Sequence, residues 1–201
     1  PFMYLPREEI RKAAGELITC GFLGTQLDAE LKEILKETQP TGIIFFARNL
    51  ESPEHLAELA RELKCHRPDT PYLLSIDQEG GRVARVKEPA TLWPPMKDLG
   101  TIDDPQLTYR VGQALATEVR AMNMDVNFAP VLDVDTNPDN PIIGDRSFGD
   151  HPELVSRHGA ALVRGLEDAG VGACGKHFPG HGDTNLDSHL DLPVVSHDLR
   201  R

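Results

Sequence analysis

Apolar residues follow two alternating patterns along the chain, one typical of amphipathic helices and one typical of buried strands. Spacings of three and four residues predict helices over residues 7–18, 28–36, 106–122 and 152–168, and another that starts at residue 53. Short apolar runs predict strands at 42–46, 72–76, 124–128 and 171–174, and a further strand around 17–22. Apolar strands separated by helices indicate a parallel sheet covered on both faces.

Local signals mark where several of these helices begin and end. Asp28 stands where an N-cap is expected, and Ser52 is followed by Pro53, which suits the first position of a helix. Gly170 is placed to end the helix predicted over 152–168.

The predicted elements amount to about five strand–helix units, which fits either a (β/α)8 barrel or a doubly wound sheet. Polar segments follow the strands directly, as both folds require of a functional site. No GxGxxG or GxxxxGK[ST] motif follows any strand, so we favour the barrel. Because a complete barrel takes about 250 residues, we expect residues 1–201 to be a single barrel domain that stops after five or six strands.

Composition narrows the class of protein. The 201 residues are 39% hydrophobic and 26% charged, which is typical of a globular chain and not of a disordered or collagen-like one. No apolar run approaches the roughly 20 residues of a membrane-spanning helix, so we expect no membrane partner. The net charge of −11 and the scattered basic residues argue against a nucleic-acid partner.

Cysteine usage and the N-terminal segment bear on the compartment. Cys20, Cys65 and Cys174 are odd in number and show no CxxC spacing, so neither a disulfide framework nor a structural zinc site is expected. Residues 1–19 contain charges and lack the apolar stretch of a signal peptide. Both features predict a cytoplasmic location.

The densest group of chemically active residues lies in residues 176–189, KHFPGHGDTNLDSH. These side chains could ligate a metal or carry out acid/base chemistry. His177 and His181 have the i,i+4 spacing of helical metal ligands, but Pro179 and Gly180 between them disfavour a helix. We therefore favour acid/base chemistry without a metal.

Within that segment, Asp187 and His189 are two residues apart, so their side chains point the same way if the backbone is extended. A carboxylate bonded to an imidazole fixes its tautomer and raises its pKa, so the ring can deliver and take back a proton near neutral pH. This pair is the predicted catalytic dyad.

Two other polar segments follow predicted strands. In residues 77–85, DQEGGRVAR, a carboxylate at the strand end could accept bonds from neighbouring sugar hydroxyls and an arginine could donate to them. The same segment could instead be a tight turn with solvated charges. In residues 144–149, GDRSFG, Arg146 could contact a ligand, or Asp145 and Arg146 could only tie the loop down. Nearby aspartates at 133, 135 and 139 lack the spacing and the closing glutamate of a calcium loop.

These motifs, together with NFAPVLDV at 127–134, resemble glycoside hydrolase family 3, and most closely its bacterial β-N-acetylhexosaminidase branch, the NagZ type. They occur in the family's order over nearly the whole chain. The resemblance implies a barrel-type retaining glycosidase that needs no cofactor and no metal. It also implies a substrate: members of this bacterial branch release N-acetylglucosamine from the non-reducing end of cell-wall muropeptides during peptidoglycan recycling.

The resemblance assigns roles to individual residues. It implies that His189, paired with Asp187, is the acid/base, in place of the second carboxylate of most retaining enzymes. The residues implied to hold the sugar are Asp77, Arg85, Arg146, Lys176 and His177.

The family's nucleophile is an aspartate in a later motif, and Asp191 and Asp198 follow the 176–189 segment too closely to be that residue. We therefore expect the nucleophile to lie beyond Arg201 and the 201-residue chain to be inactive alone. Three other functions stay open: a family 3 β-glucosidase, a glycoside phosphorylase and a non-catalytic sugar-binding fragment.

Overall fold

Five parallel strands form the main sheet in the computed structural model, which describes residues 6–187 and 190–195. Each strand neighbours the next one along the chain: β1 (Thr19–Cys20), β2 (Gly42–Phe45), β3 (Leu73–Ile76), β6 (Val126–Asn127) and β7 (Gly172–Ala173). A doubly wound sheet reverses its strand order at a switch point, whereas a (β/α)8 barrel keeps chain order. The unbroken order confirms the barrel-type architecture, of which the described residues form a five-stranded arc.

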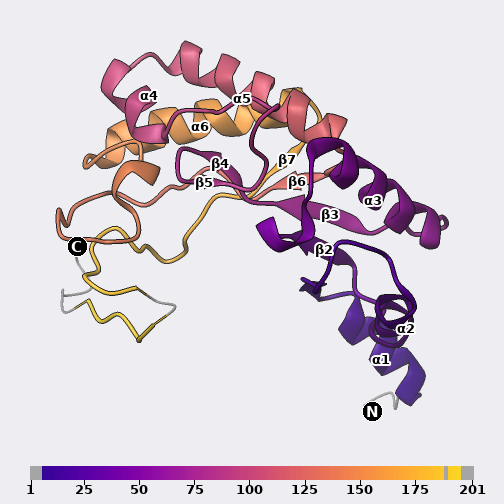
Figure 1. The fold of residues 1–201 in the computed structure, drawn as a ribbon. Coiled ribbons are helices and arrows are strands. Elements are labelled where there is room, and N and C mark those ends of the chain that lie inside the picture. The colour runs from indigo at the N-terminus through magenta and orange to yellow at the C-terminus, as the bar shows by residue number, and fades with distance from the viewer. Residues whose placement is uncertain (1–5, 188–189, 196–201) are drawn as a thin grey trace.

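Helices join successive strands, and the later ones lie along the outer side of the arc (Figure 1). α5 and α6 pack against each other more extensively than any other pair of described elements. The helices are α1 (Arg7–Gly15), α2 (Ala29–Thr38), α3 (Pro53–His66), α4 (Met96–Ile102), α5 (Pro105–Ala121) and α6 (Pro152–Asp168). No described helix has the length and apolar composition needed to cross a bilayer.

The predicted helix signals are confirmed. Asp28 Oδ1 accepts from the backbone N–H of Leu31 at 2.8 Å, and Ser52 Oγ accepts from that of His55 at 3.1 Å. Gly170 follows α6 with a positive φ of 84°, a conformation that favours glycine. The helix predicted over 7–18 was too long, because the chain leaves the helix after Gly15 and is already paired in the sheet at Thr19.

Two elements that the sequence pattern did not predict shape the site. A hairpin of β4 (Gln78–Gly80) and β5 (Val83–Ala84) follows β3 directly, and α4 lies before α5. The hairpin is polar and turns at Gly80 and Gly81, both with positive φ, so it shows no strand-like apolar run. α4 has only seven residues, too few for a helical period to stand out.

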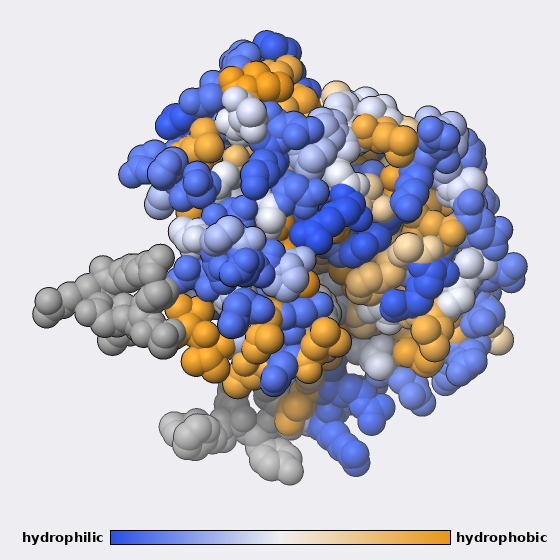
Figure 2. Space-filling view, turned by 60° about the vertical axis from the view of Figure 1, so that its left-hand side comes forward, coloured by the Kyte–Doolittle hydropathy of each residue, from blue (hydrophilic) through white to orange (hydrophobic). Residues whose placement is uncertain are grey.

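The core lies between the sheet and its covering helices. Phe45, Leu74 and Ile76 in the strands, and Leu56 and Leu63 in α3, are completely buried. Elsewhere the surface mixes hydrophilic and apolar areas (Figure 2). Large exposed apolar side chains also occur near the C-terminal end of the described chain, including Phe178 at 99% exposure and Leu190 at 85%.

Candidate active site

Asp77 follows β3 at the carboxyl end of the sheet, and the β4–β5 hairpin folds Arg85 back onto it. The side-chain amide of Gln78 fixes that fold: its oxygen accepts from the backbone N–H groups of Arg85 and Val86 at 2.9 and 3.0 Å, and its nitrogen donates to the carbonyl of Val86 at 3.0 Å. The side chain of Asn127, in β6, bonds both backbone groups of Gln78. Arg85 Nη2 thereby reaches Asp77 Oδ2 at 3.1 Å.

Lys176 joins this pair from the segment that follows β7. Its ammonium lies 2.7 Å from Asp77 Oδ1 and 2.5 Å from Glu79 Oε1. Val131 and Lys176 form a parallel β-bridge, which brings the segment alongside the chain that follows β6. Lys176 therefore links two carboxylates that lie 97 and 99 positions earlier in the sequence.

Arg146 enters from the loop between β6 and α6. Its Nε and Nη2 lie 2.9 Å from the two oxygens of Glu79, a bidentate pair in which Glu79 is 2% exposed. Asp145, the preceding residue, instead pairs with Arg82 at 2.9 Å and fastens the loop. Asp145 thus ties the loop down, as one interpretation of the GDRSFG motif predicted. Arg146 lies at the pocket, where it could contact a ligand.

His177 completes the cluster. Its Nε2 lies 3.2 Å from Arg146 Nη2, and its Nδ1 lies 2.6 Å from Asp133 Oδ2. The carboxylate of Asp133 is buried below the histidine and also accepts the backbone N–H of His181. Residues from the segments that follow β3, β6 and β7, which are neighbours in the sheet, thus meet at one place.

These side chains line a pocket of about 430 Å³, a volume within the range of small-molecule sites. All five residues predicted to hold a sugar line it: Asp77, Arg85, Arg146, Lys176 and His177. Asp77 and Glu79 line the pocket and Asp133 lies behind His177, so the cluster as a whole has three carboxylates, two guanidinium groups and one ammonium. The cluster therefore suits an uncharged ligand with many hydroxyls better than a strongly anionic one.

Two carboxylates of the cluster, Asp77 and Asp133, are held ionised. Burial raises the pKa of Asp77, but Lys176 and Arg85 outweigh it and hold that pKa below its ordinary value. Burial likewise opposes ionisation of Asp133, and hydrogen bonds from His177 and His181 bring its pKa below the ordinary value. Both side chains are thus hydrogen-bond acceptors at neutral pH.

Comparison with known proteins shows the family. The family described as "Glycosyl hydrolase family 3 N terminal domain" matches residues 9–201. The chain belongs to glycosyl hydrolase family 3. A "Beta-hexosaminidase" of Thiobacillus denitrificans is 43% identical over 177 residues, covering 85% of this chain and 49% of that protein. The chain spans about half the length of the β-hexosaminidase relatives it matches.

Solved structures of family 3 members are also similar to the chain. A β-N-acetylglucosaminidase from a Paenibacillus species gives a TM-score of 0.90 at 42% identity, over 95% of this chain and 37% of that one. NagZ from Neisseria gonorrhoeae, in complex with N-trifluoroacetyl-D-glucosamine, gives 0.84 at 40% identity, over 91% of this chain and 56% of that one.

The family 3 segment that carries the predicted dyad continues from His177. Asn140 Nδ2 donates to the carbonyl of His181 at 2.7 Å, and Asn137 Nδ2 donates to that of Thr184 at 3.1 Å. Thr136 Oγ1 donates to Asp183 at 2.8 Å. Asp187 lies three residues after Thr184, and its predicted partner His189 lies outside the described residues.

Four members of the cluster or its supports were not predicted as site residues: Gln78, Glu79, Asn127 and Asp133. Each is almost completely buried, with 3% exposure or less. Polar residues directly after apolar strands were the available signal, because a buried polar group needs partners. Asp133, Asp135 and Asp139 do not converge on a cation site: Asp133 bonds His177, Asp135 pairs with Lys97, and Asp139 is exposed.

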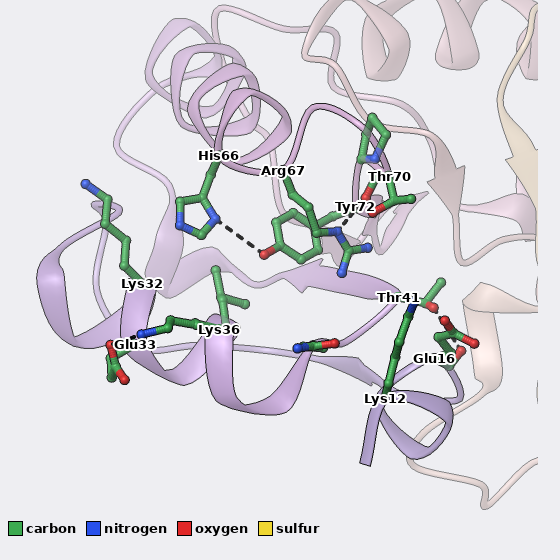
Figure 3. A pocket seen from close by; sticks show the side chains of 13 residues that line it. Lys12, Glu16, Lys32, Glu33, Lys36, Thr41, His66, Arg67, Thr70 and Tyr72 are labelled. Carbon is green, nitrogen blue, oxygen red and sulfur yellow. Dashed lines mark hydrogen bonds and ion pairs between the residues drawn. The ribbon is translucent and has the colours of Figure 1, made fainter. Parts of the chain in front are cut away.

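Two other kinds of site, a metal site and a second hollow, find less support in the described residues. Within residues 6–187 and 190–195, no three His, Cys, Asp or Glu side chains are arranged to hold a metal ion. A larger hollow of about 810 Å³ lies at the opposite, amino end of the strands (Figure 3). Arg67 at its edge stacks on Tyr72 and bonds Pro40, and the lysines around it are spread apart. It is an open surface hollow without a convergent set of reactive groups.

Proposed function

We propose that the natural protein is a β-N-acetylhexosaminidase that removes terminal, non-reducing β-linked N-acetylglucosamine by a retaining mechanism. The observation that carries this proposal is Asp77, which is ionised and held between Lys176 and Arg85 in the lining of the pocket. Similarity to proteins named β-hexosaminidase, and to a NagZ bound to an N-acyl glucosamine, supports the sugar.

In this proposal Asp77 accepts hydrogen bonds from neighbouring hydroxyls of the terminal sugar. Arg85, Arg146 and Lys176 donate to its oxygens. Nε2 of His177, which faces Arg146 Nη2 at 3.2 Å in the structure, accepts from a further hydroxyl in place of that guanidinium nitrogen. Arg85 Nε–H is buried and has no hydrogen-bond partner among the described residues, so this arginine keeps an unused donor. Charged partners make these bonds strong and directional, which fixes the anomeric carbon for attack.

The chemical step is assigned to residues later in the chain and beyond it. Asp187 orients His189, which protonates the glycosidic oxygen as the bond to the anomeric carbon breaks. An aspartate beyond residue 201 attacks that carbon and forms the covalent intermediate. His189 then takes a proton from water, the water oxygen replaces the aspartate at the anomeric carbon, and the sugar leaves with its original configuration.

The test uses the natural, full-length protein with two β-N-acetylglucosaminides, one with a p-nitrophenyl and one with a sugar leaving group. Both should be hydrolysed with retention, as followed by NMR of the anomeric proton. His189→Ala should lower kcat about 100- to 10,000-fold, more for the sugar leaving group, which needs protonation. His151→Ala, at an exposed histidine, is the control. Hydrolysis unaffected by His189→Ala would overturn the proposed dyad.

Three assays separate the alternatives. Preference for a β-glucoside would indicate a β-glucosidase, and sugar phosphate formed only with added phosphate would indicate a phosphorylase. Binding of N-acetylglucosamine by the natural protein without turnover would indicate a sugar-binding protein. The 201-residue chain alone is expected to bind but not hydrolyse, so robust turnover by it would contradict the position given to the nucleophile.

The substrates and the compartment are proposed with the activity. We infer cell-wall muropeptides as substrates, cleaved in the cytoplasm during peptidoglycan recycling. Deleting the coding gene should cause N-acetylglucosamine-containing muropeptides to accumulate in cytoplasmic extracts, as measured by mass spectrometry. An unchanged muropeptide profile would contradict the role in peptidoglycan recycling. The glycosidase activity itself is tested by the hydrolysis assay above.

A further inference from the structure

Both carboxylate oxygens of Asp133 accept hydrogen bonds from one short segment, residues 177–181. Its side chain is fully buried, and Oδ2 accepts from both Nδ1 and the backbone N–H of His177, at 2.6 and 3.2 Å. Oδ1 accepts from the backbone N–H of His181 at 2.5 Å. Three donors thus use both oxygens, and a ligand in the pocket cannot reach a carboxylate that has no exposed surface.

This contact determines the hydrogen-bonding character of His177. An ionised carboxylate only accepts hydrogen bonds, so Nδ1 of the ring carries the proton. Nε2 then carries a lone pair and accepts a hydrogen bond from Arg146 Nη2 at 3.2 Å, because a guanidinium only donates. The ring is therefore set as the Nδ1–H tautomer, with an acceptor nitrogen on the side of Arg146.

The same carboxylate anchors the base of the segment that leads to Asp187. His181 is held from both sides, its N–H by Asp133 and its carbonyl by Asn140 at 2.7 Å. Thr184 Oγ1 donates to that carbonyl as well, at 2.9 Å. Asp133 lies in the loop after β6. Its hydrogen bonds therefore fix residues 177 and 181 relative to that loop.

We propose that Asp133 is a positioning residue, which holds His177 as a hydrogen-bond acceptor at the sugar pocket and places the base of the loop carrying Asp187 and His189. The proposal rests on the proposed glycosidase function. Asp133 itself touches neither the sugar nor the reacting atoms. A single buried carboxylate thereby ties sugar binding to the start of the acid/base loop.

Asp133→Asn in the natural, full-length protein tests this role, because asparagine keeps the size but must turn an amide NH2 toward one of the present donors. We expect a folded protein in which kcat falls about 10- to 100-fold and KM rises, since small displacements of catalytic groups cost rates of this order. Asp139→Asn, an exposed aspartate in the same loop, should leave both constants unchanged. Folding is checked by circular dichroism at the assay temperature.

A spectroscopic readout separates positioning from general stability. The ¹⁵N shifts of His177 should report the Nδ1–H tautomer in the unmodified protein and a changed tautomer or exchange broadening in Asp133→Asn. A folded Asp133→Asn with kcat and KM within twofold of the unmodified protein would overturn the proposal. So would an Nε2–H tautomer of His177 in the unmodified protein, a measurement that requires no variant. Failure of the unmodified protein to hydrolyse any β-N-acetylglucosaminide would instead contradict the proposed function.

Discussion

Glu79 and Arg146 meet through two parallel hydrogen bonds of 2.9 Å, although 67 residues separate them in the sequence. Glu79 lies in the β4–β5 hairpin and Arg146 in the loop before α6, so the pair joins two walls of the pocket. Lys176 approaches Glu79 Oε1 as well, which makes this buried carboxylate the shared partner of two cations. Glu79 therefore holds the side chains of Arg146 and Lys176 next to each other.

Replacing Glu79 with glutamine should therefore destabilise the protein. Glutamine keeps one acceptor but leaves Arg146 without its charge partner and Lys176 with Asp77 alone. Breaking such a largely buried pair costs about 3 kcal/mol in the free energy of unfolding. Urea unfolding measures the change. Glu153→Gln, at an exposed position in the first turn of α6, should alter the free energy of unfolding by less than about 0.5 kcal/mol. Equal effects of the two variants would contradict the role given to Glu79.

Asp77→Asn should weaken sugar binding strongly in a protein that still folds. One side of the new amide would turn NH2 hydrogens toward Lys176 or Arg85, both of which only donate, so the asparagine could not hold both cations in place. We expect the affinity for N-acetylglucosamine to fall at least about 100-fold, as buried charged hydrogen bonds are lost. Isothermal titration calorimetry measures it, with the exposed Asp98→Asn as control. Retained affinity would place the sugar elsewhere.

Gly100→Ala should destabilise the protein although alanine is the better helix former by about 1 kcal/mol. A Cβ at Gly100 would lie 1.7 Å from the carbonyl oxygen of Phe148, two residues after Arg146, so α4 and this loop would have to separate. A lower midpoint of thermal unfolding and weaker sugar binding are expected together. Thr101→Ala, at the next, exposed position of α4, should change neither property. An unaltered midpoint of thermal unfolding for Gly100→Ala would show that the loop moves away from α4 without a cost in stability.

Stability should decline in acid because of Asp77 and Asp133. Their pKa values are lowered in the folded protein relative to an unfolded aspartate, whose pKa is about 3.9. The unfolded chain therefore binds more protons between these values, and the free energy of unfolding falls as the pH drops below about 4. Urea unfolding at several pH values between about 6 and 2 should show this decline, and Asp133→Asn should make it shallower. A slope identical in the variant would mean that Asp133 contributes nothing to it.

The local pattern of the chain predicted much of the architecture. α6 was predicted over the same residues that it occupies, and the caps at Asp28 and Ser52 lie where they were expected. Such features depend on hydrogen bonds and burial within a few neighbouring residues, which the order of residue types encodes directly. The resemblance to family 3 implied five sugar-binding side chains in the polar segments that follow strands. These side chains meet in one pocket because the carboxyl ends of parallel strands share one edge of the sheet.

The sequence by itself determined the strands of the main sheet, the longer helices and the segments in which reactive residues lie, since these depend largely on neighbours along the chain. The β4–β5 hairpin and the short helix α4 emerged only in the structure. Only the tertiary structure decided that Glu79 holds Arg146 and Lys176 together and that Asp133 serves His177 and His181 at once. These contacts join residues 44 to 97 positions apart. Their geometry depends on how the strands are placed around the arc, and a buried carboxylate takes its role from the donors that packing brings to it.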